Sequence, residues 1–494
     1  MATLKELRNE RIQKLEKLRK LGIDPFPAQA QKDFDNKEVV ENFEKFENKE
    51  IVLAGRIITL RQHGAIIFAD LHDQSGKIQL YIKEDSYISK DLTFENLKLL
   101  DAGDFIQATG KVTKTERGEI SLLTTEIKLL AKSLRPLPDK RGGLKDSELI
   151  HRRRYVDLAT NPERRALFER KAKFWEVNRE FLKKQGFMEV ETPILELIPG
   201  GADATPFTTH MNALDQDFYL RISPELYLKR LVGGGYEKVF TIGPNFRNEG
   251  LSHEHLPEFY NVEWYWAYAD YRDNMEMIKE MFRYIANEVY GKTKFESKGH
   301  TFDLADEWEE IDYVETIKEK FEVDIFETSD KEILEILKKN KVSLPGTVNR
   351  NRLIDNLWKL IRKEVSGPAF LLNEPKFMSP LAKSKLDNPE ITERFHIIIA
   401  GSENGNGYSE LNDPFDQFER FKEQQSARDA GDKEAQMMDV DYVEMLEYGM
   451  PPNSGYAHGE RLFWTLEGIT AREGTLFPHM KPKLDNTTKE IYSL

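Results

Sequence analysis

Apolar and polar positions follow different periods in different parts of the chain. Over residues 4–22, apolar side chains recur every three or four positions among many charged ones, which is the period of an amphipathic helix. Pro25 and Pro27 end this helix, because proline cannot continue the helical hydrogen bonds. Such a helix packs either on its own chain or on a partner, and we favour packing on its own chain. The apolar positions are Leu4, Leu7, Ile12, Leu15, Leu18 and Leu21.

Residues 50–130 change to short apolar runs separated by turn signals such as Ser75-Gly76 and Arg117-Gly118. Several short strands in such a span predict a small Greek-key barrel, and the OB-fold is the natural candidate. Barrels of this class bind single-stranded nucleic acid through aromatic and polar groups on the strand surface. The predicted strands are 51–57, 65–71, 77–82 and 105–110.

A stiff linker and one large domain follow the barrel. Pro136 and Pro138 disfavour both helix and strand, which predicts a linker over residues 134–145. The later chain contains no GxxxxGK[ST] loop and no GxGxxG, so a nucleotide site there needs an architecture other than the P-loop or Rossmann folds. We predict helices at 163–185, 272–290 and 352–365, and a mixed, charged insert at 307–345.

Composition narrows the classes of protein. The chain has 494 residues and no cysteine, which excludes disulfides and cysteine-ligated zinc and fits a reducing compartment. It has neither an apolar run long enough for a membrane span nor an N-terminal signal peptide, so the cytoplasm is the expected location. The net charge of −14 argues against a generic, charge-driven nucleic-acid binder such as a DNA-coating protein. Residues 152–154, all arginine, are either a local RNA-binding patch or a solvated junction.

Residues 243–259 carry the most informative chemistry. Arg247 is a fixed cation that can grip phosphate, and His255 is a second potential cation. Glu249 can accept a hydrogen bond from an exocyclic amine, and Phe259 can stack on a base. This set suits a nucleotide. On charges alone, a hairpin with ordinary surface ion pairs explains the segment equally well.

The sequence of this segment, Phe-Arg-Asn-Glu-Gly followed by His-x-Pro-Glu-Phe, resembles the second signature motif of class II aminoacyl-tRNA synthetases. The continuation at 263–271 is similar to the lysine-specific, bacterial-type members. Further matching segments cover nearly the whole chain in family order. They lie at 154–158, 186–193, 198–202, 222–230, 379–383 and 405–413.

The resemblance implies an α+β fold, in which an antiparallel sheet flanked by helices carries ATP and an N-terminal OB-fold barrel holds the anticodon. The expected parts are an N-terminal helical segment (1–48), the barrel (49–133), the linker (134–145) and the catalytic domain (146–494). The implied activity is that of a lysine–tRNA ligase. Lysine is first activated with ATP to lysyl-adenylate, releasing pyrophosphate, and is then transferred to the 3′ end of tRNA(Lys).

The resemblance also implies roles for individual residues. Arg247 would hold the α-phosphate and the lysine carboxylate, and Arg461 would take the γ-phosphate or lie beside the adenine; these two are the expected catalytic residues. Glu249 and Phe259 would fix the adenine, and His255 would assist the outer phosphates. The expected lysine-binding residues are Gly201, Glu225, Arg247, Glu263, Tyr265, Asn406, Tyr408 and Glu410.

In the barrel, Phe68 and Gln79 match the positions where the family stacks and hydrogen-bonds an anticodon base. Without the resemblance, Phe68 reads more readily as a core aromatic. Residues 186–193 are similar to the first family motif, which builds a twofold interface, so a homodimer is expected.

Two departures from the family pattern concern ATP. The family usually holds magnesium with two glutamates seven residues apart, whereas this chain has Glu403 at the second position and His396 at the first. Magnesium prefers oxygen, so Glu403 is the expected ligand and the number of ions is open. The third motif is one residue shorter than the family pattern GxGxGxxR and has Tyr456 and His458 in place of glycines. Glycine permits close approach of the backbone, so these replacements are expected to alter the floor of the ATP site.

These departures leave two alternatives to the ligase. The chain could lysylate an acceptor other than tRNA. Related stand-alone catalytic domains lysylate a protein, but they lack the barrel, so the barrel favours tRNA. It could also be a paralogue that binds RNA or lysine without catalysis. Retention of the whole set of lysine-pocket residues speaks against the second alternative.

Overall fold

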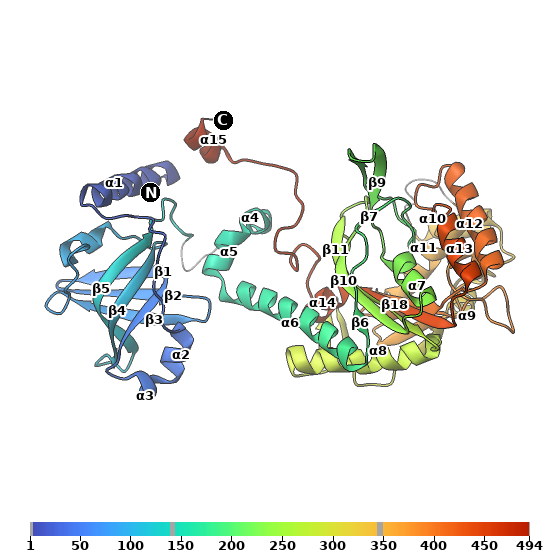
Figure 1. The fold of residues 1–494 in the computed structure, drawn as a ribbon, viewed down its shortest axis with the longest axis horizontal. Coiled ribbons are helices and arrows are strands. Elements are labelled where there is room, and N and C mark those ends of the chain that lie inside the picture. The colour runs from blue at the N-terminus through green and yellow to red at the C-terminus, as the bar shows by residue number, and fades with distance from the viewer. Residues whose placement is uncertain (1–2, 139–143, 343–348, 494) are drawn as a thin grey trace. The chain divides into compact units, whose positions relative to one another are not determined.

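The structure is a computed structural model, and it describes residues 3–138, 144–342 and 349–493. Residues 139–143 of the predicted linker and 343–345 of the predicted insert lie outside this description. The chain forms two compact units, residues 1–161 with 480–494, and residues 162–479 (Figure 1). Residues 146–161 and 480–494, expected in the catalytic domain, fall in the same unit as the barrel. Within the described ranges, no helix is both long and apolar enough to cross a membrane.

The first unit is built around a closed five-stranded barrel with the strand order β1-β2-β3-β5-β4. Alternate residues of its strands point inward and form one apolar core, as period-two patterning predicts. Leu18 of the N-terminal helix joins this core, so that helix packs on its own chain. The elements are α1 (Leu4–Lys20), α2 (Asn36–Glu41), α3 (Phe43–Phe46), β1 (Glu50–His63), β2 (Ile66–His72), β3 (Lys77–Lys83), β4 (Phe105–Lys114), β5 (Ile120–Ala131), α4 (Ser147–Arg152), α5 (Arg154–Thr160) and α15 (Asn486–Tyr492).

The second unit is built on an eight-stranded sheet with the order β14-β15-β16-β17-β18-β11-β10-β6. Its central strands are antiparallel, as expected, but the outermost pairs β14–β15 and β10–β6 are parallel. The strands are β6 (Met188–Glu189), β10 (Lys238–Phe246), β11 (Glu258–Ala267), β14 (Glu309–Asp312), β15 (Ala369–Leu372), β16 (Arg394–Ile399), β17 (Ser402–Ser409) and β18 (Asn453–Gly459). Smaller sheets use β7 (Leu195–Glu196), β8 (Thr208–Met211), β9 (Gln216–Leu220), β12 (Lys294–Ser297) and β13 (His300–Asp303).

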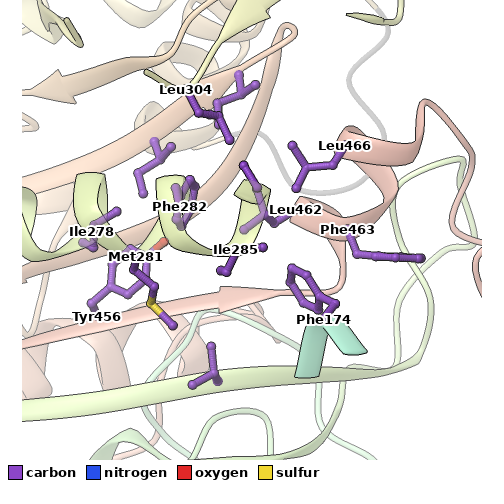
Figure 2. Close-up of a cluster of buried hydrophobic side chains, with 14 of the residues drawn as sticks. Phe174, Ile278, Met281, Phe282, Ile285, Leu304, Tyr456, Leu462, Phe463 and Leu466 are labelled. Atoms are coloured by element: carbon purple, nitrogen blue, oxygen red, sulfur yellow. The ribbon is translucent and has the colours of Figure 1, made fainter. Parts of the chain in front are cut away.

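Helices cover the two faces of this sheet differently. One face packs on α6, α8 and α14 in a large aromatic core, part of which Figure 2 shows. The other face packs on α7, α12 and α13 along β10, β11 and β17, and on α9, α10 and α11 along β15 and β16, and it leaves room for cavities. The helices are α6 (Pro162–Lys184), α7 (Glu225–Gly233), α8 (Tyr271–Ile285), α9 (Tyr313–Phe321), α10 (Asp330–Lys339), α11 (Arg350–Arg362), α12 (Pro414–Asp429), α13 (Val440–Tyr448) and α14 (Arg461–Glu467). The predicted helix at 272–290 continues beyond α8 as a π-helical turn, Ala286–Tyr290.

Candidate active site

Two neighbouring cavities gather most of the residues singled out by the sequence. The first, of about 290 Å³, is lined by seven of the eight residues expected to bind lysine: Gly201, Glu225, Arg247, Glu263, Tyr265, Asn406 and Tyr408. The second, of about 420 Å³, is lined by all six residues expected to bind ATP: Arg247, Glu249, His255, Phe259, Glu403 and Arg461. Arg247 lines both cavities, and so does Asn406.

Strand geometry explains why distant residues share these cavities. Glu263 and Tyr265 alternate on β11, so they face the same side of the sheet. Asn406 and Tyr408 do the same on β17. Glu403 has the opposite parity, but the register of β16 and β17 shifts between Ile397 and Ile398, which pair with Gly405 and Glu403. This bulge places one extra residue in β17 and brings Glu403 to the face of Asn406.

Gly201 needs to be a glycine. Its φ of +83° lies in the left-handed region, and a Cβ there would come within 2.6 Å of the Cβ of Glu225. The missing side chain lets the main chain approach the start of α7 closely. The main-chain N–H of Gly201 donates to Oε1 of Gln436 at 3.3 Å, which fixes this loop at the rim of the first cavity.

Buried carboxylates dominate the first cavity. The hydroxyl of Tyr265 donates to Oε1 of Glu263 at 2.9 Å, and the hydroxyl of Tyr408 donates to Oε1 of Glu225 at 2.6 Å. Glu410 lies behind the cavity wall and is fully buried. The sequence reasoning missed Lys229, whose ammonium contacts both Glu225, at 2.6 Å, and Glu410. The position four residues after Glu225 on a helix was the available signal.

Carboxylates outnumber cations in the lining of this cavity, where Asp203, Glu225, Glu263 and Glu374 face Arg247 and Arg394. Burial, with the nearby Glu225 carboxylate, raises the pKa of Glu263 to about 7. Burial also raises the pKa of Glu410, although Lys229 opposes the shift. A carboxyl whose pKa is raised in this way becomes fully ionised when a cation enters. The geometry therefore suits a ligand that carries an ammonium group.

The second cavity presents cations. Arg461 begins α14 and donates through Nη1 to the main-chain oxygen of Glu403 at 2.9 Å. Its Nη2 lies 3.0 Å from Nε2 of His255, which must accept because guanidinium only donates. Nδ1 of His255 therefore carries the hydrogen and donates to Oγ of Ser252 at 2.8 Å. Burial and the charge of Arg461 lower the pKa of His255 to about 4. His255 is thus neutral at pH 7, which corrects the expectation of a second cation.

Arg247 follows the end of β10 at the junction of the two cavities. Its Nε donates to the main-chain oxygen of Ile222 at 3.3 Å, and its guanidinium carbon lies 5.2 Å from the centre of the Phe259 ring. Across the described part of the chain, the partners of the Arg247 and Arg461 guanidinium groups are neutral: two main-chain oxygens and the His255 ring. Both charges are available to an anion.

Tyr456 and His458 do not form a new floor for the second cavity. Their side chains lie on the opposite face of the sheet, where Tyr456 packs 4.5 Å from Trp264 between ring centres and His458 lies 5.5 Å from Phe282. Figure 2 shows Tyr456 beside Phe282 and Met281 in this core. Gly455, Ala457 and Gly459 alternate with them along β18 and line the cavities, so the side chains that β18 presents there are small. The expectation that Tyr456 and His458 alter the floor of the ATP site is therefore wrong, because their side chains lie in the core on the other face of the sheet.

The residues at the family's metal positions do not fit a protein-held magnesium ion. Glu403 is paired with Arg362 at 2.8 Å, and Nε2 of His396 lies 3.1 Å from Oε2 of Glu374. Among the residues described, no group of three or more histidine, aspartate or glutamate side chains could hold a metal. Magnesium prefers several oxygen ligands, and this pair offers one engaged carboxylate and a nitrogen. The contacts of Glu403 therefore speak against its expected role as a magnesium ligand.

In the barrel, Phe68 and Gln79 are accessible from outside. Phe68 is half-buried between inward-facing neighbours on β2, and its ring stacks on Tyr81 at 5.2 Å between centres. It is not a core aromatic. Gln79 on β3 is also half-buried, and its Oε1 accepts from Oγ of Ser121 at 3.0 Å. A stacked aromatic pair beside an amide is the kind of surface on which single-stranded bases bind.

Two family models match the chain. One, tRNA synthetases class II (D, K and N), covers residues 146–481, and the other, an OB-fold nucleic acid binding domain, covers residues 51–130. The chain belongs to the class II tRNA synthetase family. The family resemblance and the α+β architecture expected from the sequence are confirmed.

Individual members of this class II family are similar over almost their full length. A protein named lysine–tRNA ligase from Thermotoga maritima is 43% identical over an alignment of 490 residues, with 97% of each chain covered. One of the same name from Thermoanaerobacter pseudethanolicus is 45% identical over 487 residues, 98% of this chain and 97% of the relative. Another from Pelotomaculum thermopropionicum is 44% identical over 490 residues.

Proposed function

We propose that this class II synthetase is a lysine–tRNA ligase, which activates L-lysine with ATP and transfers it to the 3′ end of tRNA(Lys). The relatives that carry this name support the proposal, and so do the two adjoining cavities. The single observation that carries it is the position of Arg247, where a carboxylate-lined cavity meets a cation-lined one. A cationic amino acid and a nucleoside triphosphate would meet at that point.

The first step joins the two substrates. A carboxylate oxygen of lysine attacks the α-phosphorus of ATP, the bond from that phosphorus to the bridging oxygen breaks, and pyrophosphate leaves with the electron pair. No general base is required, because the lysine carboxylate is already ionised at pH 7. Arg247 holds the carboxylate and the α-phosphate together and offsets the negative charge that spreads in the transition state. The ribose hydroxyl at the tRNA end then attacks the acyl carbon, and AMP leaves.

Lysine recognition depends on compensating its buried ammonium. Glu263 and Tyr265 contact the side-chain ammonium, with Glu410 and Lys229 behind them balancing charge. Glu225 and the Gly201 main chain take the α-amino group, and Asn406 takes the carboxylate. Tyr408 forms a wall of the pocket. An analogue without the side-chain amine would leave buried carboxylates unpaired, which is a costly loss.

ATP lies in the second cavity. Phe259 stacks on the adenine and Glu249 accepts from its exocyclic amine. Arg461 binds the outer phosphates, and neutral His255 donates or accepts there without adding charge. Magnesium, when it accompanies ATP, supplies further charge neutralisation.

The barrel binds the anticodon, with Phe68 stacking on a base and Gln79 bonding to its edge. We also expect a homodimer that uses residues 186–193, since β6 in this segment is an edge strand of the large sheet. Sedimentation at micromolar concentration tests the dimer, and a monomer contradicts it. The cytoplasmic location expected from the sequence belongs to the same proposal.

Lysine-dependent exchange of pyrophosphate into ATP tests the activation step. We expect exchange with lysine and none with other standard amino acids. No exchange with any amino acid would overturn activation and favour the non-catalytic paralogue.

Charging of a tRNA(Lys) transcript tests the acceptor. The Phe68→Ala variant should keep exchange and weaken charging, because loss of one base stack costs about 1–3 kcal/mol. Equal charging by the variant and the wild type, or exchange without any charging, would favour another acceptor.

A further inference from the structure

Glu403 sits between two arginines. Its carboxylate oxygen Oε1 accepts from Nη1 of Arg362 at 2.8 Å and from Nε1 of Trp358 at 3.3 Å, both on α11. Its main-chain oxygen accepts from Arg461. The carboxylate therefore already has a counter-ion.

His396 is turned toward a different partner. Its Nε2 lies 3.1 Å from Oε2 of Glu374, an oxygen that also lies 3.0 Å from Nε of Arg394. The imidazole therefore completes a buried cluster with Glu374 and Arg394. No pair of carboxylates remains at these two positions to share a divalent ion between them.

The guanidinium group of Arg362 has N–H donors that Glu403 does not engage. Its side chain is 14% exposed and lines the second cavity together with Arg461 and His255. Its Nε is buried and has no hydrogen-bond partner among the described residues. A guanidinium has five N–H donors, and the carboxylate of Glu403 accounts for one of them. A fork of this kind matches the oxygens of a phosphate.

We propose that Arg362 is a further phosphate-binding residue of this chain, held by Glu403, and that its charge replaces a protein-held magnesium ion at the outer phosphates. The proposal deepens the ligase assignment and rests on it for the identity of the nucleotide. It follows that ATP enters with the one divalent ion that it carries in solution, and that the protein itself adds none at Glu403.

Binding of α,β-methylene-ATP without lysine or tRNA tests Arg362 directly. We expect Arg362→Gln to weaken binding about 10–100-fold, because one charge-assisted hydrogen bond contributes about 1.5–3 kcal/mol. Arg362→Lys should recover part of the loss. Lys363→Gln is the matched control, since Lys363 follows Arg362 and is exposed. Wild-type affinity in Arg362→Gln, or an equal loss in Lys363→Gln, would overturn the proposal.

Equilibrium dialysis with Mn²⁺ tests how many divalent ions the protein and the nucleotide bind together. The wild type with the analogue should hold one Mn²⁺ per nucleotide, and the double variant His396→Glu, Arg362→Gln should hold two. A second Mn²⁺ in the wild type would contradict the proposal. Because neither assay contains lysine, a failure of lysine activation would leave these results standing and would be seen separately in pyrophosphate exchange.

Discussion

The two cavities of the catalytic unit share Arg247 and differ in how their charges are balanced. Four carboxylates line the first cavity, against the two guanidinium groups of Arg247 and Arg394, and Glu410 and Lys229 form an ion pair behind its wall. This excess of carboxylates is a deficit of positive charge, and burial with the nearby Glu225 carboxylate raises the pKa of Glu263 there. A lysine side chain would remove the deficit.

In the second cavity most carboxylates already have a basic partner. These ion pairs are Glu403 with Arg362, Asp355 with Lys359, Glu254 with Lys298, and Glu460 with Lys171. Arg247 and Arg461 have no carboxylate partner among the described residues, so their charges are left for a ligand, together with the N–H donors of Arg362 that Glu403 does not engage. Each cavity thus lacks the charge that its proposed substrate brings. Specificity in this molecule depends on incomplete charge balance as much as on shape.

The residue common to both cavities should give the largest effect. Arg247→Gln should lower the kcat of lysine-dependent pyrophosphate exchange by about 10²–10³-fold, because a transition-state contact is lost. Arg272→Gln is the control, since Arg272 is exposed on α8 and lines neither cavity. A change of less than about tenfold in Arg247→Gln would show that the cavities do not meet at this side chain.

A substitution confined to the first cavity should affect lysine binding and leave ATP binding unchanged. Glu263→Gln keeps a hydrogen-bond acceptor but removes the charge, at a cost of about 2 kcal/mol, so the KM for lysine should rise about 30-fold. The KM for ATP should stay the same in the exchange assay. Glu258→Gln on the same strand is exposed and should change neither value. An equal rise in both KM values would show that the cavities are not independent.

Patterning predicted four of the five barrel strands and the helices α1, α6, α8 and α11, because these periods depend on local positions, but it did not predict β5. Most of the residues that line the cavities were expected from the family resemblance. It did not predict the face on which Glu403 lies, since a bulge at Gly405 reverses the parity of β17. The third motif was misread for a related reason. Its larger residues, Tyr456 and His458, fall on the core face of β18.

Charge partners were the harder part of the site to foresee. Lys229 was within reach, since it is one helical turn from Glu225. Arg362 was not, because it is 41 residues from Glu403 and meets it only through the packing of α11 on the sheet. Ion pairs between distant segments depend on tertiary structure and leave no local pattern.

Acid stability tests whether the third-motif change lies beneath the sheet and not in the second cavity. Burial lowers the pKa of His458 to about 3, whereas an unfolded histidine has a pKa of about 6.5. The unfolded state therefore binds more protons below pH 6.5, and stability falls as the pH falls toward 3. From pH 7 to 5.5, His458 alone should lower the free energy of unfolding by about 1 kcal/mol, and His458→Phe should remove this loss.

Urea unfolding followed by tryptophan fluorescence measures this difference at the two pH values. All six tryptophans lie within residues 162–479, so the signal reports the catalytic unit alone. His253→Asn is the control, because His253 is exposed. Binding of α,β-methylene-ATP should stay the same in His458→Phe. A weakened affinity would place the effect of this motif in the second cavity after all.

Proton release gives the smallest signal and the sharpest test of the charge deficit. A carboxyl with a pKa near 7 is half protonated at pH 7, and an arriving ammonium lowers that pKa. Lysine binding should then release about half a proton from Glu263 at pH 7, and less at pH 8.5. Calorimetric titration in phosphate and in Tris measures the release as a difference in binding enthalpy, because the two buffers take up protons with different heats. If binding proves independent of the buffer at pH 7, Glu263 is already ionised in the empty cavity, and the first cavity has no deficit for the substrate to remove.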